Sequence, residues 1–265
     1  LAGPFDLEGV TALLPAGSAR CALDIALHDL AGRTAGISVG DLIGVGGRGL
    51  PPTSVTIPIA SPDEMVARAS SLADHPILKM KVGFDGDVDV VRAVRDVFPG
   101  AIRIDANEGW ELDQAIERLD ALGDCRIELC EQPVPAGRHD DLGKVRRASP
   151  IPVFADEDAC TAADVADLAG CVDGVNLKLR KAGGIRETVN AIAVARSLGM
   201  DVMLGCNLET GIATTAAAYV APLVDHADLD GPLLLAADPF PGVSYSSGSV
   251  TLPDGPGLGL EARPE

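Results

Sequence analysis

A regular alternation of strand-like and helix-like segments is the feature that most restricts how this chain can fold. Eight short apolar runs begin about 20 to 28 residues apart, which is the length of one strand–helix unit. The runs cover residues 54–59, 77–82, 102–106, 126–131, 152–156, 175–179, 201–204 and 227–229. Helical patterns at 90–97, 112–122, 162–168 and 185–198 separate several of them. The chain therefore predicts an α/β fold, a modified TIM barrel of the (β/α)7β type.

A doubly wound open sheet is the alternative fold for such an alternation. It would need fewer strands and usually carries a glycine-rich phosphate loop after the first strand. Residues 44–49 match the pattern G-x-G-x-x-G, but a helical pattern at 18–30 precedes them and Leu50-Pro51-Pro52 follows. A nucleotide loop needs a strand before it and a helix after it. We therefore predict an ordinary loop at 44–49 and favour the barrel.

Composition excludes several classes of partner. The 265 residues carry 39 acidic and 21 basic side chains, a net charge of −18, which argues against nucleic acid and anionic membranes. The six cysteines form no C-x-x-C pair, a spacing typical of free thiols in a reducing compartment. No run of 18 apolar residues is present that could span a membrane. We expect a cytoplasmic homo-oligomer that acts on a small molecule.

Three carboxylates stand where consecutive predicted strands end. These are Asp105, Glu131 and Asp156, at the ends of the third, fourth and fifth runs. Each alone would more often be a solvated acid or a helix cap. Carboxyl ends of barrel strands meet at one face, so the three acids can converge, and packed acids repel unless a cation joins them. All-oxygen ligation predicts Mg²⁺ or Mn²⁺ at this point.

Lysine is scarce in the chain and gathers near two strands. Only five of the 21 basic residues are lysine, and four of them, Lys79, Lys81, Lys178 and Lys181, lie in or beside the second and sixth runs. These runs are four apart and oppose each other in a ring of eight. Two amines on either side of a metal indicate proton transfer, since lysine can act as a base and arginine cannot. An ion pair with one of the acids is the alternative role for Lys81, and Lys181 and Arg180 read as structural or surface residues.

Six segments together carry a resemblance to a known family. They are Ala22–Ala26, Lys79–Lys81, Ile104–Asn107, Glu131–Pro133, Ala155–Glu157 and Asn176–Lys178. In this order and spacing the chain resembles the muconate-lactonising subgroup of the enolase superfamily, in which a lysine base works with one or two Mg²⁺ ions. The resemblance implies that Asp105, Glu131 and Asp156 hold the metal. It implies Lys81 and Lys178 as acid/base catalysts and Lys79 as a support for Lys81 or for the substrate carboxylate.

The end of the eighth run narrows the expected activity. Asp228-Leu229-Asp230 resembles the D-x-D motif of dipeptide epimerases, where paired acids bind the free ammonium group of the substrate. Two carboxylates on one face of a strand end form a cation receptor, although they could also be solvated acids of an acidic protein. The resemblance further implies that Cys206 and Asn207 line the substrate pocket. We expect a Mg²⁺-dependent epimerase that inverts the α-carbon of a dipeptide of the L-Ala-D/L-Glu type.

Three alternative functions remain open at this point. A muconate-type cycloisomerase or o-succinylbenzoate synthase would use the same scaffold. A lyase could use Lys178 or Lys81 as a Schiff-base nucleophile, and a barrel fragment without catalysis is the third alternative.

We divide the chain into three parts. Residues 1–52 are expected to be a helical portion of an α+β capping domain, 53–238 the catalytic barrel, and 239–265 a tail that packs on the capping region. The resemblance leads us to expect that much of the capping domain is not represented in this sequence. Asp158 stands where relatives often carry a small hydroxyl residue, which adds negative charge near the predicted metal.

Overall fold

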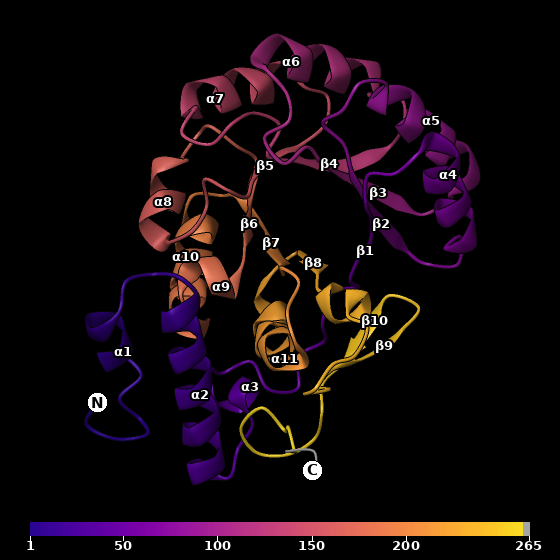
Figure 1. Ribbon diagram of the computed structural model, residues 1–265. Helices are drawn as coiled ribbons and strands as arrows, with labels where there is room; N and C mark the ends of the chain where they lie inside the picture. Colours follow the sequence, from indigo (N-terminus) through magenta and orange to yellow (C-terminus); the bar gives the residue numbers. More distant parts are fainter. Residues whose placement is uncertain (262–265) are drawn as a thin grey trace.

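A ring of eight parallel strands forms the centre of the molecule in the computed structural model, which describes residues 1–261 (Figure 1). The strands are β1 Val55–Ile57, β2 Ile77–Lys81, β3 Ala101–Asp105, β4 Ile127–Glu131, β5 Val153–Ala155, β6 Gly174–Leu177, β7 Asp201–Gly205 and β8 His226–Asp228. Each pairs with the next, and the backbone N–H of Ser54 donates to the carbonyl of Ala227 at 3.2 Å, which brings β8 back to β1. The predicted barrel is confirmed, with every strand end within two residues of its expected position.

Seven major helices follow the first seven strands and cover the outside of the ring (Figure 1). They are α4 Pro62–Ser71, α5 Asp87–Val97, α6 Leu112–Ala121, α7 His139–Ala148, α8 Ala162–Asp167, α10 Ile185–Ser197 and α11 Gly211–Val220. A single turn of helix, α9 Leu179–Ala182, precedes α10, and 3₁₀ turns η1 Ala221–Leu223 and η2 Gly231–Leu234 flank β8. The amphipathic pattern explains the packing: in α5, Val90, Val91 and Val94 are buried, while Asp89, Arg92 and Asp96 are exposed. Residues 44–49 form a loop, as predicted.

The interior of the barrel is smaller and more polar than the core outside it. Alternate side chains of a strand point to opposite faces, so each strand supplies one set to the interior. Leu129, Phe154 and Met203 form an apolar cluster of their own there. Arg103 of β3 is also buried, and its guanidinium donates to the Ala227 carbonyl at 2.7 Å. These side chains form a floor, and the next interior positions along β3, β4 and β5 are charged: Asp105, Glu131 and Asp156.

An N-terminal helical segment packs on one side of the barrel. It contains α1 Gly9–Leu13, α2 Ser18–Ala35 and α3 Val39–Leu42, and α2 lies beside α9 and α10 (Figure 1). The chain after β8 forms a hairpin of β9 Ser244–Ser246 and β10 Ser249–Thr251 and then returns to this segment, where Gly257 makes backbone hydrogen bonds with Ile37 and Val39. The division at residues 52 and 238 stays a prediction. Within residues 1–261, no helix has the length and apolar character needed to cross a membrane.

Truncation of the interior cluster provides a test of the packing. Phe154→Ala should lower the free energy of unfolding by about 3–5 kcal/mol, because the barrel interior cannot collapse around the lost ring. Leu198→Ala is the matched control, since Leu198 is 44% exposed and should change stability by no more than about 0.5 kcal/mol. Urea titration followed by circular dichroism measures both; equal stabilities of the two variants would contradict the interior placement of Phe154.

Candidate active site

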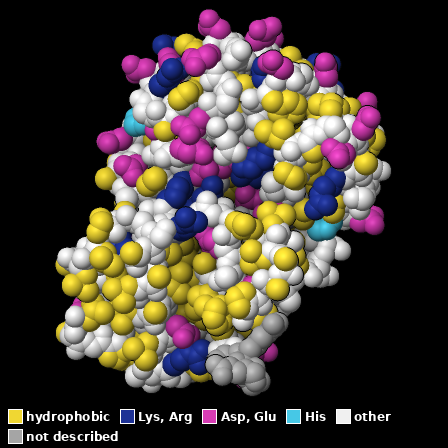
Figure 2. Space-filling model, viewed as in Figure 1, with side chains coloured by type: hydrophobic (Ala, Val, Ile, Leu, Met, Phe, Trp, Pro, Cys, Tyr) yellow, Lys and Arg dark blue, Asp and Glu magenta, His cyan; other side chains and the backbone are white. Residues whose placement is uncertain are grey.

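Acidic and basic side chains gather around a hollow at the centre of the ring (Figure 2). Asp105 and Glu131 are the last residues of β3 and β4, and Asp156 directly follows β5. All three are buried, with exposed fractions of 0%, 0% and 1%. The three predicted metal ligands are therefore brought to one end of the barrel by consecutive strands, as their spacing in the sequence indicated.

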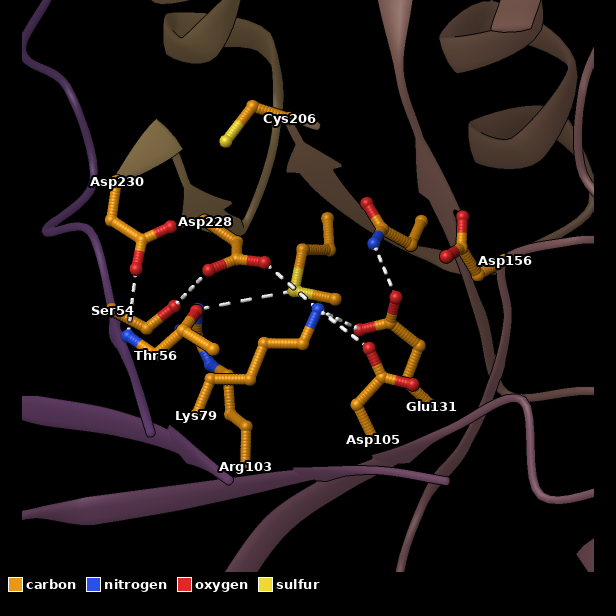
Figure 3. Close-up of polar contacts among 12 residues, drawn as sticks. Ser54, Thr56, Lys79, Arg103, Asp105, Glu131, Asp156, Cys206, Asp228 and Asp230 are labelled. Atoms are coloured by element: carbon orange, nitrogen blue, oxygen red, sulfur yellow. Dashed lines mark hydrogen bonds and ion pairs between the residues drawn. The ribbon is translucent and has the colours of Figure 1, made fainter. Parts of the chain in front are cut away.

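The ammonium group of Lys79 lies among the acids of this end (Figure 3). Its Nζ is 3.0 Å from Asp105 Oδ2, 2.7 Å from Glu131 Oε2 and 2.8 Å from Asp228 Oδ2. Burial lowers the pKa of Lys79, but the charges of Asp105, Asp228 and Glu131 raise it well above its usual value. Lys79 therefore remains charged and holds these three carboxylates together.

Glu131 is the acid with the most unfavourable surroundings. Burial and the neighbouring charge of Asp105 raise the pKa of Glu131 to about 8. Its Oε1 accepts a hydrogen bond from Asn176 Nδ2 at 2.7 Å, whereas Oε2 faces Lys79 and receives no hydrogen bond from residues 1–261. A buried carboxylate oxygen in this condition indicates a place where a further cation would be favourable.

Two lysines occupy opposite sides of the hollow. Lys81, at the end of β2, donates to Asp105 Oδ2 at 2.6 Å and to Asn107 Oδ1 at 2.7 Å. Lys178 donates to Asp156 Oδ2 at 2.6 Å. The expected sixth strand was two residues too long, because β6 ends at Leu177 and Lys178 stands at the N-terminus of α9. The strand order nevertheless places β2 and β6 four apart in the ring.

The electrostatic state of Lys178 is set by the acids around it. Burial lowers the pKa of Lys178, but the charges of Asp156 and Glu131 have the larger combined effect, so the pKa lies above its usual value. Burial correspondingly raises the pKa of Asp156, but the ammonium groups of Lys181 and Lys178 bring it well below its usual range. Lys178 and Asp156 thus form a charged pair with Lys178 in its protonated form.

Asp228 and Asp230 are close in sequence but have different partners. Asp228 accepts a hydrogen bond from Ser54 Oγ at 2.6 Å and one from Lys79 at 2.8 Å. Asp230 accepts from the backbone N–H of Thr56 at 2.7 Å and forms no ion pair with any described residue. Burial and the charge of Asp228 raise the pKa of Asp230 to about 6. Asp230 is therefore the acid of the pair whose charge is less compensated by the protein.

The two predicted pocket residues after β7 behave differently. Cys206 Sγ accepts a hydrogen bond from the N–H of Gly231 at 3.2 Å, and its side chain lies across from Asp228 and Asp230 (Figure 3). Asn207 contacts Glu209, with Nδ2 3.4 Å from Oε1, and within residues 1–261 forms no hydrogen bond to the other predicted site residues. The structure thus brings Cys206, but not Asn207, into the polar cluster.

Several site residues were missed in the sequence. Asn176 contacts Glu131 and lies within β6, and Ser54 contacts Asp228 and directly precedes β1. The alternation of side chains along these segments could have identified both residues. Lys181, interpreted as structural or surface, lies in the site, where its Nζ contacts the Asp156 carboxylate. That contact depends on the α9 turn, which the apolar pattern did not reveal.

The chemistry of the acids suits a hard divalent cation. Asp105, Glu131 and Asp156 supply only oxygen donors, the set that Mg²⁺ prefers, and Glu131 retains an oxygen without a hydrogen bond. In the described chain no group of three acid, histidine or cysteine side chains has the arrangement of a metal site, and lysine ammonium groups lie among the acids. The donor set therefore fits a metal ion, while in this structure lysine ammonium groups contact these three acids.

Comparison with known proteins agrees with the fold and identifies a family. Residues 7–44 match the family model described as the mandelate racemase / muconate lactonizing enzyme N-terminal domain, and residues 64–265 match the enolase C-terminal domain-like model. The fold and the strand-end acids define a barrel of the enolase class. The chain belongs to the enolase superfamily, as its motifs predicted.

Individual relatives narrow the similarity further. The chain is 40% identical over 264 residues to the L-Ala-D/L-Glu epimerase of Bacteroides thetaiotaomicron, covering 97% of this chain and 69% of the relative. A dipeptide epimerase from Cytophaga hutchinsonii, solved with Mg and the dipeptide D-Ala-L-Val, has 34% identity and a TM-score of 0.93, covering 99% of this chain and 76% of the other. A muconate lactonizing enzyme has 26% identity and a TM-score of 0.89, covering 98% and 78%.

Removal of the central ammonium should be costly. Lys79→Met would leave three buried carboxylates without their common partner, and we expect it to lower the free energy of unfolding by about 3–5 kcal/mol at neutral pH. Lys144→Met is the control, because Lys144 is half exposed and its ion pair in the described part of the chain is with the helix neighbour Asp141. Thermal or urea unfolding measures the stability of both variants. EDTA is present in the buffer so that no divalent cation can replace the missing ammonium group. A Lys79 variant as stable as the Lys144 variant would show that the acids do not need this lysine.

Proposed function

We propose that this protein is a dipeptide epimerase that inverts an α-carbon by proton transfer between Lys81 and Lys178. One observation carries the proposal: the two lysines stand on opposite sides of a barrel end whose centre is lined by buried carboxylates. The 40% identity to a relative named L-Ala-D/L-Glu epimerase supports a dipeptide of that type as substrate.

The proton transfer uses one lysine on each face of the substrate. The neutral form of one lysine removes the α-proton, and the ammonium form of the other delivers a proton to the opposite face, so that the products are the inverted dipeptide and two lysines with exchanged protonation. Asp105 and Asn107 orient Lys81, and Asp156 orients Lys178, through the hydrogen bonds that these residues accept. In the reverse direction the two lysines exchange the roles of base and acid.

Asp105, Glu131 and Asp156 would hold the metal ion, with Mg²⁺ as the proposed cofactor and Mn²⁺ still a prediction. When bound, the ion supplies positive charge that stabilises the negative charge developing on the substrate carboxylate as the α-proton leaves. Lys79 supports this function by keeping Asp105, Glu131 and Asp228 in place. Its ammonium group is enclosed by these three carboxylates, so we propose that Lys79 acts as a fixed positive charge and not as a base.

The amino end of the dipeptide would bind near Asp228 and Asp230. Because Asp228 already accepts hydrogen bonds from Lys79 and Ser54, we propose that Asp230 binds the substrate ammonium group more directly. Cys206, beside these acids, would contact the adjoining part of the substrate. The role of Asn207 stays a prediction, as does a homo-oligomeric state.

The alternative functions have less support. The identity to a muconate lactonizing enzyme is 26%, against 40% for the epimerase, and acids at the end of β8 would repel a dicarboxylate substrate. The relatives described above are named as epimerases or as a muconate lactonizing enzyme, and none of them is named as a lyase. Borohydride with a carbonyl substrate would trap an imine in a lyase and none in a two-base epimerase.

The two-base proposal predicts a division of labour between the lysines. In D₂O with Mg²⁺, a library of L,L-dipeptides should include members that acquire deuterium at the α-carbon of the C-terminal residue. Lys81→Ala should slow this exchange from one epimer, and Lys178→Ala from the other, each by about 10²-fold or more. Substitution of the exposed Lys144 by Ala should leave both rates unchanged. Mass spectrometry and NMR follow the label. Absence of exchange with every dipeptide, or equal residual rates from both epimers, would be incompatible with the proposal.

The ammonium-binding proposal predicts a pH dependence. A substrate ammonium binds the ionised form of Asp230, so its dissociation constant should fall as pH rises through about 6, the pKa of this acid. Between pH 5 and 7 the ionised fraction grows about tenfold, and affinity should follow. Calorimetric titration with a free dipeptide and its N-acetyl form, on wild type and Asp230→Asn, tests this. The dependence should vanish in the variant and for the N-acetyl compound; its persistence in either would refute a role for Asp230.

A further inference from the structure

Two buried polar clusters lie outside the site, and each stands behind one of the two lysines. The first, the Asp87 cluster, consists of Asp87, Gly83, Trp110 and Arg118. The second, the Asp24 cluster, consists of Asp24, Arg20, His28, Ala182 and Ile185. Neither cluster contains a predicted metal ligand or another predicted site residue. Buried charges of this kind need an explanation, because burying a charged group is unfavourable unless it is paired and hydrogen-bonded.

One carboxylate oxygen organises the Asp87 cluster. Asp87 Oδ2 accepts hydrogen bonds from the N–H of Gly83 at 2.9 Å, Trp110 Nε1 at 2.9 Å and Arg118 Nη1 at 2.7 Å. Asp87 and Trp110 are each 1% exposed. The guanidinium of Arg118 also lies over the Trp110 ring, 5.7 Å from its centre, and donates to the Phe84 carbonyl at 3.0 Å.

These contacts tie together the two loops on either side of Lys81 and its partners. Gly83 lies two residues after Lys81 in the loop that follows β2, and Trp110 lies in the loop that follows β3 and contains Asn107. Gly83 has φ +95°, and a Cβ there would be 2.7 Å from the Ala106 carbonyl oxygen, so the two loops are in close contact. The Asp87 cluster therefore determines how Lys81 sits relative to Asn107.

The Asp24 cluster joins helix α2 to the segment that follows Lys178. Asp24 Oδ1 accepts a hydrogen bond from the N–H of Ile185 at 2.6 Å, at the start of α10. Arg20 donates through Nη2 to the carbonyl of Ala182, the last residue of α9. His28 Nδ1 lies 2.8 Å from the Asp24 carbonyl oxygen and 3.3 Å from its Oδ1. All three α2 side chains are buried.

The position of α9 determines the position of Lys178. The carbonyl of Lys178 accepts hydrogen bonds from the N–H groups of Lys181 and Ala182, each at 3.0 Å, so Lys178 is part of this single turn. The turn ends at Gly183 and Gly184, both in positive-φ conformations, and has too few residues to be stable alone. It is therefore held from outside by Arg20 and Asp24.

The two clusters are separate in space. The Asp87 cluster lies among β2, β3, α5 and α6, and the Asp24 cluster among α2, α9 and α10 on the other side of the barrel (Figure 1). They share no residue and no hydrogen bond. We infer that Asp87 and Asp24 are positioning residues, of which Asp87 acts on Lys81 and Asp24 acts on Lys178. This inference rests on the proposed two-lysine proton transfer and adds the groups that align each lysine.

The consequence is an effect on one direction of proton transfer only. Asp87→Asn should slow α-proton exchange about tenfold or more from the epimer that Lys81 deprotonates, and change the other rate by less than about twofold; Asp24→Asn should do the reverse. The Lys81→Ala and Lys178→Ala variants identify which epimer each lysine serves. Trp110→Phe and Arg20→Lys, which each remove or weaken one contact, should give milder effects of the same direction and serve if a variant with an asparagine fails to fold.

Two further measurements separate positioning from loss of structure. Asp85→Asn is the surface control. Asp85 also lies near Arg118, with its Oδ1 3.8 Å from Nη2, but its side chain is fully exposed, so the substitution should leave both rates unchanged. Amide hydrogen exchange should increase at residues 82–86 in Asp87→Asn and at 182–186 in Asp24→Asn, and not in the opposite segment.

The outcomes distinguish the inference from the proposed function. If the wild type and lysine variants behave as proposed but each cluster variant slows both epimers equally, the positioning inference is overturned while the epimerase proposal stands. If the wild type exchanges no α-proton of any dipeptide, the two-lysine reaction itself is wrong, and the positioning inference that depends on it is wrong as well.

Discussion

The buried contact between the Lys79 ammonium and three carboxylates is the interaction on which the centre of this molecule depends. Removing charged groups from water is unfavourable by several kcal/mol per ion, and only close pairing offsets it. Lys79 meets that condition with Asp105, Glu131 and Asp228, which come from three different strands. The barrel must close in register for this to occur, so the contact couples the fold to the arrangement of the site.

The same charges explain why the interior is divided into a floor and a polar end. Leu129, Phe154 and Met203 fill the lower interior, and Arg103 closes it toward β8 through its hydrogen bond to the Ala227 carbonyl. This guanidinium helps to lower the pKa of Asp228, after the larger contributions of Lys79 and Ser54. Asp228 thus remains ionised, although burial alone would favour its protonation.

The sequence predicted the barrel and the convergence of the acids because both depend on local patterns. Strand periodicity fixes which side chains enter the interior, and parallel strands of similar length bring their ends to one face. The partners of Lys181 and Asp230 could not be predicted in this way. The contact of Lys181 with Asp156 depends on the short α9 turn, and the contact of Asp230 is with the backbone of Thr56, which is distant in the sequence. The Asp87 and Asp24 clusters were missed for the same reason: an acid in a helix reads as a surface residue until its distant donors are known.

The balance of charge in the site bears on the substrate it can accept. Four lysines, Lys79, Lys81, Lys178 and Lys181, lie among five acids, Asp105, Glu131, Asp156, Asp228 and Asp230, so the cluster is nearly neutral despite its density of charge. Positive groups lie toward β2 and β6, and Asp230, which forms no ion pair with any described residue, lies just beyond the end of β8. A molecule with a carboxylate at one end and an ammonium at the other would match this separation, whereas an ion of a single sign would be favoured at one end and repelled at the other. A zwitterionic dipeptide meets that requirement, and the electrostatics of the barrel end therefore favour the same substrate class as the relatives.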